Sequence, residues 1–427
     1  MPGQAAANVR VCVRIRKPFR EGEKCSLECD PRAGNVLKLP SGEEKSYQIV
    51  LGPDASQHDA YVYCGEPLVD ALLSGQRACL FAYGQTGSGK TFSMFGAEGG
   101  KMSKLDGIVP LLVAELFRRI SKMESETVCE FRCSVNYLEV QNTKVLDLLT
   151  EKQSSDGLKT RSSDTGLEVL GATTTRVQSA RALTQIIEKA SKRRATAANS
   201  MHEHSSRSHA YLTLHLERRT PESSQSTKIN LIDLAGSETF DSSGSGSGAG
   251  INTGLLALGK VLAALADKKP HIPFRDSVLT RLLQGPLGGN SVTTMLACIN
   301  PSKDHIGESQ STLRYASRAA SVVNATELAK VNVLLKSATI PSSIAQCTVV
   351  EFSSKKDPKF FEKKMAAEVI KYFKSHEFRG PMQGHGNSSK LPLLSRLAGG
   401  FAAWESESGN NPSGKDADTS SSRRMSK

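Results

Sequence analysis

The sequence predicts an α/β fold in which a central, mostly parallel sheet is covered by helices on both faces and is followed by a short C-terminal extension. Segments with the period-two alternation of strands are interleaved with segments of helical periodicity, which is typical of such a sheet. A glycine-rich sequence, Gly84–Thr91, also joins a strand-like apolar run to a helical pattern. With 427 residues, the chain can hold one α/β domain of about three hundred residues and an appendage.

The first half of the chain begins with a strand-like pattern. Over residues 9–16, valines and one isoleucine alternate with arginine and cysteine, as in a half-buried strand. The next predicted elements are a buried strand at 78–83, a helix that starts near Lys90, an amphipathic helix at 111–117, a strand at 131–140, a short apolar segment at 144–149 and an exposed polar loop at 151–166.

The second half continues the same alternation. It predicts strands at 212–216, 229–233 and 294–300, and helices at 182–192, 255–266 and 312–322. Because helices separate the strands, we expect parallel strand pairs with helices packed on both faces of the sheet.

The density of motifs falls after Asn324, so we expect a main domain at residues 8–324, an extension at 325–379 and a disordered tail at 380–427. Residues 358–378 form an amphipathic helical pattern that would dock on the main domain, on a partner or on a membrane surface. The sequence contains no internal repeat and no heptad run long enough for a dimerising coiled coil.

The composition predicts a soluble, cytoplasmic protein with an acidic partner. Lys and Arg total 55 against 43 Asp and Glu, which gives a net charge of +12; on charge alone, nucleic acid, an anionic membrane and an acidic cytoskeletal filament all remain open. The nine cysteines lack a CxxC pair and are interpreted as reduced thiols. We find no signal peptide, no transmembrane segment and no nucleic-acid motif.

The segment Gly84-Gln85-Thr86-Gly87-Ser88-Gly89-Lys90-Thr91 is a Walker A sequence. Its glycines let the backbone N–H groups point at a phosphate chain, and the following helix adds the positive end of its dipole. Lys90 would reach the β- and γ-phosphates, and the Thr91 hydroxyl would bind Mg²⁺. The chain is therefore expected to bind a nucleoside triphosphate.

Two further segments fit a phosphate-sensing role. Asp233-Leu234-Ala235-Gly236-Ser237-Glu238 follows a buried strand; Asp233 would hold Mg²⁺ through water, and the N–H of Gly236 would sense a γ-phosphate. In Ser205-Ser206-Arg207-Ser208-His209, a serine hydroxyl would complete the magnesium shell. Arg207 would pair with Glu238 to close the site, although without a family a surface ion pair is the simpler interpretation of Arg207.

These three segments, in this order, resemble the phosphate loop and the two switches of a kinesin motor domain. Further matching blocks lie at Gly107–Pro110, Asp147–Leu149, Leu287–Asn290 and Ser311–Ala319, and the resemblance extends from about residue 8 to residue 324. It implies a kinesin-type P-loop NTPase fold and an ATPase that uses ATP and Mg²⁺, binds microtubules and converts γ-phosphate loss into movement.

The resemblance also assigns roles by position. It implies that Thr91 and Ser206 ligate Mg²⁺, that Ser205 positions the lytic water, and that Glu238 pairs with Arg207 and relays a proton. Microtubule contacts would come from Leu255–Ala266 and His271–Arg281. Cations at Lys268, Lys269, Arg275 and Arg281 would face acidic tubulin.

The sequence departs from the family at several positions. The residues expected against the adenine are Pro18, which follows Ile15-Arg16-Lys17, and Phe92 in place of a frequent histidine. His202 replaces a family asparagine. The linker Thr239–Gly250 is short and consists mainly of serine and glycine, which costs about 1 kcal/mol of helix stability per glycine relative to alanine.

We therefore expect a cytoplasmic, microtubule-associated motor whose ATPase is coupled to movement. The alternative is a divergent kinesin fold that binds microtubules or tubulin with weak or uncoupled turnover. Intact Lys90, Thr91 and Asp233 favour the enzyme, whereas His202 and the Ser/Gly linker favour the alternative. Because no coiled coil follows Asn324, we also expect that the chain does not walk processively as a dimer.

Overall fold

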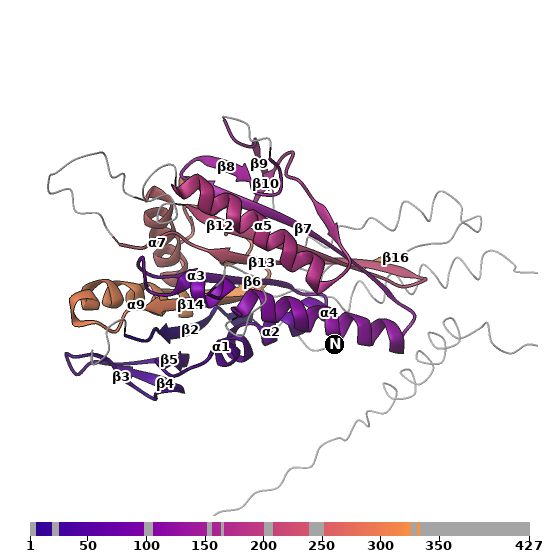
Figure 1. The fold of residues 1–427 in the computed structure, drawn as a ribbon. Coiled ribbons are helices and arrows are strands. Elements are labelled where there is room, and N and C mark those ends of the chain that lie inside the picture. Colours follow the sequence, from indigo (N-terminus) through magenta and orange to yellow (C-terminus); the bar gives the residue numbers. More distant parts are fainter. Residues whose placement is uncertain are drawn as a thin grey trace, which may run out of the picture. The chain divides into compact units, whose positions relative to one another are not determined.

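A computed structural model of the chain describes residues 6–18, 25–97, 106–151, 156–163, 166–199, 208–238, 252–325 and 331–333. By its contacts the chain divides into two units, 1–339 and 340–427, and every described residue belongs to the first. The helical pattern predicted at 358–378 and the tail predicted at 380–427 lie outside the described residues. Figure 1 shows the described elements in sequence colours.

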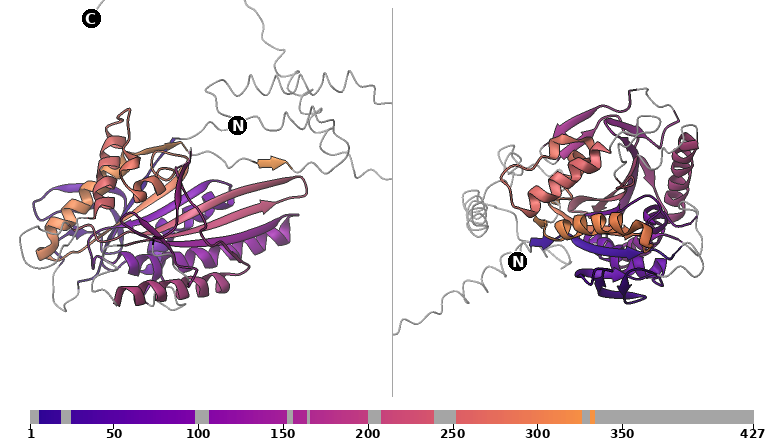
Figure 2. Two further views of the ribbon diagram at one scale, coloured as in Figure 1. Left: turned by 90° about the horizontal axis from the view of Figure 1, so that it is seen from above. Right: turned by 90° about the vertical axis from the view of Figure 1, so that its left-hand side faces the viewer.

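Most strands join one twelve-stranded sheet with helices on both sides (Figures 1 and 2). Its main path runs β11 (Thr175–Val177), β7 (Glu130–Gln141), β12 (His209–Arg219), β13 (Ser223–Asp233), β6 (Arg77–Tyr83), β14 (Ser291–Ile299), β2 (Arg10–Ile15), β5 (Glu44–Leu51), β4 (Ala33–Lys38) and β3 (Glu28–Cys29). β8 (Lys144–Asp147) pairs with β7, and β16 (Val331–Val333) pairs with β13.

The predicted α/β fold is confirmed, and its sheet is mixed rather than mostly parallel. β13, β6, β14, β2 and β5 run parallel in the centre, while the flanking pairs are antiparallel. The reason lies in the connections: a tight turn in which Thr220 N–H bonds to Ser223 O joins β12 to β13, and so short a link only allows an antiparallel hairpin.

Helices cover both faces of the sheet, as Figure 2 shows in its left view. Beside one face lie α1 (Gln57–Cys64), α2 (Glu66–Leu73), α3 (Lys90–Phe95), α4 (Ile108–Glu126) and α5 (Ala180–Asn199). Beside the other lie α7 (Thr253–Ala266), α8 (Val278–Leu282) and α9 (Ile306–Ala320), with the short 3₁₀ turns η1 (Phe274–Asp276) and η2 (Lys303–His305). Successive strand residues serve opposite cores: Leu80 packs with Leu112, whereas Phe81 packs with Leu258.

Some elements are more extensive than the sequence predicted. The loop expected at 151–166 contains β9 (Thr160–Ser163) and the start of β10 (Gly166–Val169), which form a hairpin. An ion pair of 2.6 Å between directly opposed Arg161 and Glu168 stabilises this hairpin despite its weak strand propensity. The helix expected at 312–322 is α9, which begins six residues earlier, at Ile306.

Asn324 joins the segment after α9 to the turn before β14. β15 (Val323–Ala325) pairs with β1 (Ala6–Asn8), and the buried Asn324 amide donates to Pro286 O and Ser291 O, each at 2.8 Å, while its oxygen accepts from Gly288 N–H at 2.8 Å. These bonds tie both ends of the predicted domain, 8–324, to the turn before β14.

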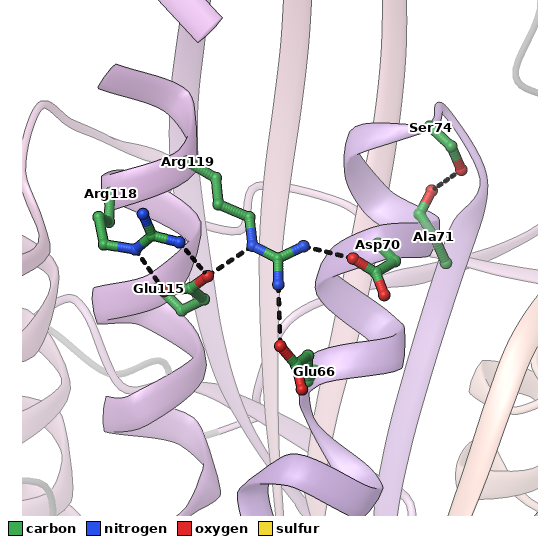
Figure 3. Close-up of polar contacts among 7 residues, drawn as sticks. All are labelled: Glu66, Asp70, Ala71, Ser74, Glu115, Arg118 and Arg119. Carbon is green, nitrogen blue, oxygen red and sulfur yellow. Dashed lines mark hydrogen bonds and ion pairs between the residues drawn. The ribbon is translucent and has the colours of Figure 1, made fainter. Parts of the chain in front are cut away.

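The side chain of Arg119 links α4 to α2 (Figure 3). The Arg119 guanidinium contacts Glu115 on its own helix and Glu66 and Asp70 on α2, whereas among the described residues Arg118 bonds only to Glu115. Among the described residues, no helix has the length and apolar character needed to cross a membrane, and the eight cysteines in this part of the chain are free thiols.

Candidate nucleotide site

The glycine-rich segment forms a loop between β6 and α3, at the carboxyl end of the parallel strands. Gly84 has φ 151°, and a Cβ there would lie 2.1 Å from the carbonyl oxygen of Cys298 on the neighbouring β14, so only glycine fits. Gly89, with φ 95°, is the residue that precedes the first turn of α3. The tight turn between a strand and a helix agrees with the predicted geometry of a phosphate loop.

Lys90 is the buried cation of this loop. Its ammonium donates to the carbonyls of Gly84 at 2.8 Å and Gln85 at 2.9 Å, and burial lowers its pKa. The two carbonyl oxygens are neutral, so the ammonium lacks an anionic partner among these contacts. A phosphate oxygen would supply one, which fits the role predicted for Lys90.

Thr91 and Asp233 meet at the base of the loop. The Thr91 hydroxyl donates to Asp233 Oδ2 at 2.6 Å, although the two residues belong to α3 and β13. Within the described part of the chain, three buried polar atoms near this contact have no hydrogen-bond partner: Asp233 Oδ1, Ser88 Oγ and Gln85 Oε1. A hydroxyl, a carboxylate and unpartnered oxygens suit a hydrated Mg²⁺ bound together with phosphates.

The segment after β13 lies against the phosphate loop. Ser237 N–H bonds to Gly84 O at 3.1 Å, and the Glu238 carboxylate accepts the N–H of Thr86 at 2.8 Å and the Thr86 hydroxyl. A Cβ on Gly236 would lie 2.3 Å from the Thr86 hydroxyl oxygen and from a Glu238 carboxylate oxygen, so a side chain here would displace the contact between Thr86 and Glu238. The expected pairing of Glu238 with Arg207 involves a residue outside the described ones.

Outside the phosphate loop, the site opens into a cleft of about 890 Å³. Its far wall includes Pro18 and the half-exposed Phe92, both predicted to face the base. Two further residues at this wall were not predicted from the sequence. Arg14 lies over the Phe92 ring at 5.7 Å and donates to Gln57 at 2.6 Å, and Gln57 donates to Phe92 O at 2.7 Å. Only the helix-start pattern Ser56-x-x-Asp59, a capping box, marks this corner in the sequence.

Next to Asp233, the largely covered side chain of Arg194 joins three elements. Arg194 on α5 lies 3.6 Å from Asp233 Oδ2 and 3.5 Å from Glu139 Oε1, and donates to Ser208 O at 2.9 Å. Ser208 in turn donates to Glu139 at 2.6 Å. Periodicity could not find this residue, because Arg194 lies beyond the end of the helix predicted at 182–192.

His209 supports the same corner without acting as a metal ligand. Its Nδ1 accepts the Ala235 N–H at 3.0 Å, so the proton of the neutral ring is on Nε2. Burial, followed by the charge of Arg194, lowers its pKa to about 3. The neutral imidazole therefore fixes the backbone just before Gly236.

Several predicted residues lie outside the described ones: Ser205, Ser206, Arg207 and His202, and the linker Thr239–Gly250. The segments predicted to face a filament are described. Leu255–Ala266 lies within α7, and His271–Arg281 includes η1 and most of α8. Lys268, Lys269 and Arg275 are exposed there, and Lys260 of α7 pairs with Asp276 at 3.7 Å.

A phosphate loop at the ends of parallel strands, with a carboxylate from the adjacent strand at its base, defines a P-loop nucleoside triphosphatase. Within that class, residues 30–322 match the family model described as the kinesin motor domain. The chain belongs to the kinesin motor domain family.

Individual proteins that the chain resembles are also kinesins. The chain is 38% identical over 338 residues to the chromosome-associated kinesin KIF4 of Xenopus laevis, and this match covers 74% of the chain and 27% of that protein. It is 36% identical over 350 residues to the kinesin-like protein KIF7 of Homo sapiens, a match that covers 76% of the chain and 26% of that protein. The chain thus spans about a quarter of the length of these relatives. A solved structure of a fast kinesin, whose title refers to ATPase mechanism and interactions with microtubules, matches with a TM-score of 0.69 and 30% identity over 82% of this chain and 99% of that one.

Proposed function

We propose that this chain is a microtubule-associated motor that hydrolyses ATP and couples hydrolysis to microtubule binding and movement, with its motor domain at residues 8–324. The observation that carries the proposal is the convergence of Lys90, Thr91, Asp233 and Glu238 on one loop in a member of the kinesin motor domain family. The cytoskeleton is accordingly its proposed location.

Each group has a distinct task in the proposed reaction. Lys90 binds the β- and γ-phosphate oxygens and balances the charge that develops as the γ-phosphoryl group leaves. Thr91, Ser206 and Asp233 hold Mg²⁺, which when bound neutralises phosphate charge. Ser205 orients the attacking water, and Glu238 accepts its proton through a second water.

Coupling follows from the contacts of the Asp233–Glu238 segment. Glu238 and Ser237 bond to the phosphate loop, and the chain continues from them toward α7, where the proposed filament surface begins. Loss of the γ-phosphate from the N–H of Gly236 would release this segment and change the position of α7. Exposed cations near the end of α7 then meet acidic tubulin.

The test is the steady-state ATPase of the full chain with and without polymerised microtubules. We expect turnover to rise with microtubule concentration, and Lys90→Ala to abolish it. If microtubules leave turnover unchanged, the motor proposal fails, and the alternative of a microtubule-binding protein with uncoupled ATP turnover is favoured.

A charge reversal tests the filament surface. Lys269→Glu, near the end of α7, should raise the microtubule concentration needed for half-maximal stimulation severalfold, most strongly at low salt. Lys122→Glu is the matched control, because Lys122 is exposed on α4 beside the opposite face of the sheet. An equal effect of both reversals would show that only net charge matters.

A further inference from the structure

A second cavity, of about 980 Å³, lies on the sheet away from the phosphate loop. Its floor is the face of the sheet that α7, α8 and α9 cover farther along the strands. Part of its wall comes from Leu167 and Val169 of β10, and part from Leu282 and Pro286 at the end of α8 and after it. Its volume is that of sites that bind small organic ligands.

Strand register brings an unusual row of side chains to this floor. Ile229 pairs with Ala78, so Lys228 is next to Arg77 on the neighbouring strand. His215 pairs with Lys228 and Ser291 with Arg77. All of these side chains except those of Ile229 and Ala78 line the cavity, and the latter two belong to the core on the opposite face.

Polarity changes along the strands on this face. Phe81, Ile232 and Tyr211 are apolar and lie in the core with α7, α8 and α9. On the same face, the next side chains along β6, β13 and β12 toward the cavity are Cys79, Asn230 and Thr213. The ones after them, inside the cavity, are Arg77, Lys228 and His215. A sheet face that becomes cationic inside a cavity is not required by packing, because apolar side chains would fill that space at lower cost.

The charges of this row are not balanced within the described residues. Lys228 has no carboxylate or hydrogen-bond partner there, and Arg77 bonds only to the amide oxygen of Asn290, at 3.3 Å. The acidic residues of the cavity have other partners: Glu168 pairs with Arg161, and Glu217 with Arg219. Burial, and then the charge of Arg77, lowers the pKa of Lys228, as expected for an uncompensated cation.

His215 completes the polar lining. Its Nε2 lies 2.7 Å from Asn136 Oδ1, and because the Asn136 amide nitrogen already donates to Thr173 O and Thr174 Oγ1, Nε2 must be the donor. This contact fixes the ring against β7, beside the strand that carries Lys228.

We propose that this cavity is a binding site for a phosphorylated small molecule, whose phosphate oxygens pair with Lys228 and Arg77. Two neighbouring cations without carboxylate partners, in a partly buried cavity, supply the charge that a phosphate group needs, and the fork of Arg77 adds paired donors. The residues that line this cavity and those that line the nucleotide cleft do not overlap, so binding here can be measured with the cleft filled.

The test is binding of inorganic pyrophosphate to the full chain, measured by calorimetry with excess ADP and Mg²⁺ present to fill the phosphate-loop cleft. We expect one additional site, and a loss of affinity of about tenfold or more in Lys228→Met and in Arg77→Gln. Lys122→Gln, which removes the same charge elsewhere, should bind as the parent does. No binding by the parent, undiminished binding by both cavity variants, or an equal loss in Lys122→Gln would each overturn the site.

Stability gives a second readout. Without an anion, Lys228→Met should resist urea at least as well as the parent, because it removes a buried charge that lacks a partner. Pyrophosphate should then protect the parent against urea but not this variant. If the variant is destabilised and pyrophosphate protects both chains equally, Lys228 is a structural residue and the proposal fails.

Discussion

The Thr91 hydroxyl donates a 2.6 Å hydrogen bond to Oδ2 of Asp233, although the two residues are 142 positions apart in the chain. This contact joins the first turn of α3 to the end of β13, and it leaves the other carboxylate oxygen of Asp233 without a partner among the described residues. The pair is therefore organised for a third participant, which we infer to be hydrated Mg²⁺.

Removing the Thr91 hydroxyl should abolish Mg²⁺-dependent turnover. Thr91→Val keeps the shape but has no oxygen, so we expect basal ATP hydrolysis to fall by about a hundredfold or more, in the range found when one group that stabilises a transition state is deleted. Thr91→Ser retains the hydroxyl and should stay within a few-fold of the parent. Comparable activity of Thr91→Val and Thr91→Ser in a steady-state assay would refute the magnesium assignment.

The placement of Lys90 and Thr91 at the start of a helix could be predicted, because a glycine-rich loop between a strand and a helix has one dominant geometry. Arg14 and Arg194 could not, since each acts through partners far along the chain: Gln57 for Arg14, and Glu139 and Asp233 for Arg194. The antiparallel flanks of the sheet were missed for a similar reason. Alternation identifies a strand such as β12, but the direction of its neighbour depends on the length of the turn that follows.

Arg194 should contribute strongly to stability. Glu139 and Asp233 are both buried, and Arg194→Met would leave them without this nearby cation. We expect the free energy of unfolding to fall by about 3 kcal/mol, as when one partner of a buried ionic network is removed. The adjacent Arg193 pairs with the exposed Glu151 and donates to Leu148 O at 2.9 Å, so Arg193→Met should cost less, about 1 kcal/mol. Urea unfolding of the two variants distinguishes a buried network from a general effect of arginine loss.

Acid should destabilise the domain through its buried histidines. Burial is the main cause that lowers the pKa of His209 from 6.5 to about 3 and that of His215 to about 4. Below pH 6.5 the unfolded chain therefore binds protons that the folded chain does not, and stability falls with pH by about 1.4 kcal/mol per unit for each histidine until its folded pKa is reached.

His209→Asn tests this linkage, because asparagine keeps an acceptor for the Ala235 N–H but does not titrate in this range. Urea unfolding at several pH values between 6.5 and 5 should show a slope that is shallower by about 1.4 kcal/mol per pH unit than in the parent. His215→Asn should reduce the slope by a similar amount, and the two effects should add. A slope that neither substitution changes would exclude these histidines as its source.

Arg118 and Arg119 are neighbours on α4, but only Arg119 contacts a second helix. Arg119 contacts Glu66 and Asp70 on α2 as well as Glu115, whereas the bonds of Arg118 within the described part of the chain go only to Glu115, on its own helix (Figure 3). We expect Arg119→Ala to lower the free energy of unfolding by about 1–2 kcal/mol, and Arg118→Ala by less than about 0.5 kcal/mol.

The effect of Arg119→Ala should also depend on pH. Hydrogen bonds from Arg118 and then from Arg119 lower the pKa of Glu115 from 4.5 to about 2, so the stability from this ionised carboxylate is present above pH 4.5 and is lost as the pH falls toward 2. Urea unfolding at pH 7 and near pH 2 should therefore show a smaller difference between Arg119→Ala and the parent at the lower pH, where Glu115 is also protonated in the folded chain. A difference that stays constant would mean that the aliphatic part of Arg119, and not its charge, holds α2 against α4.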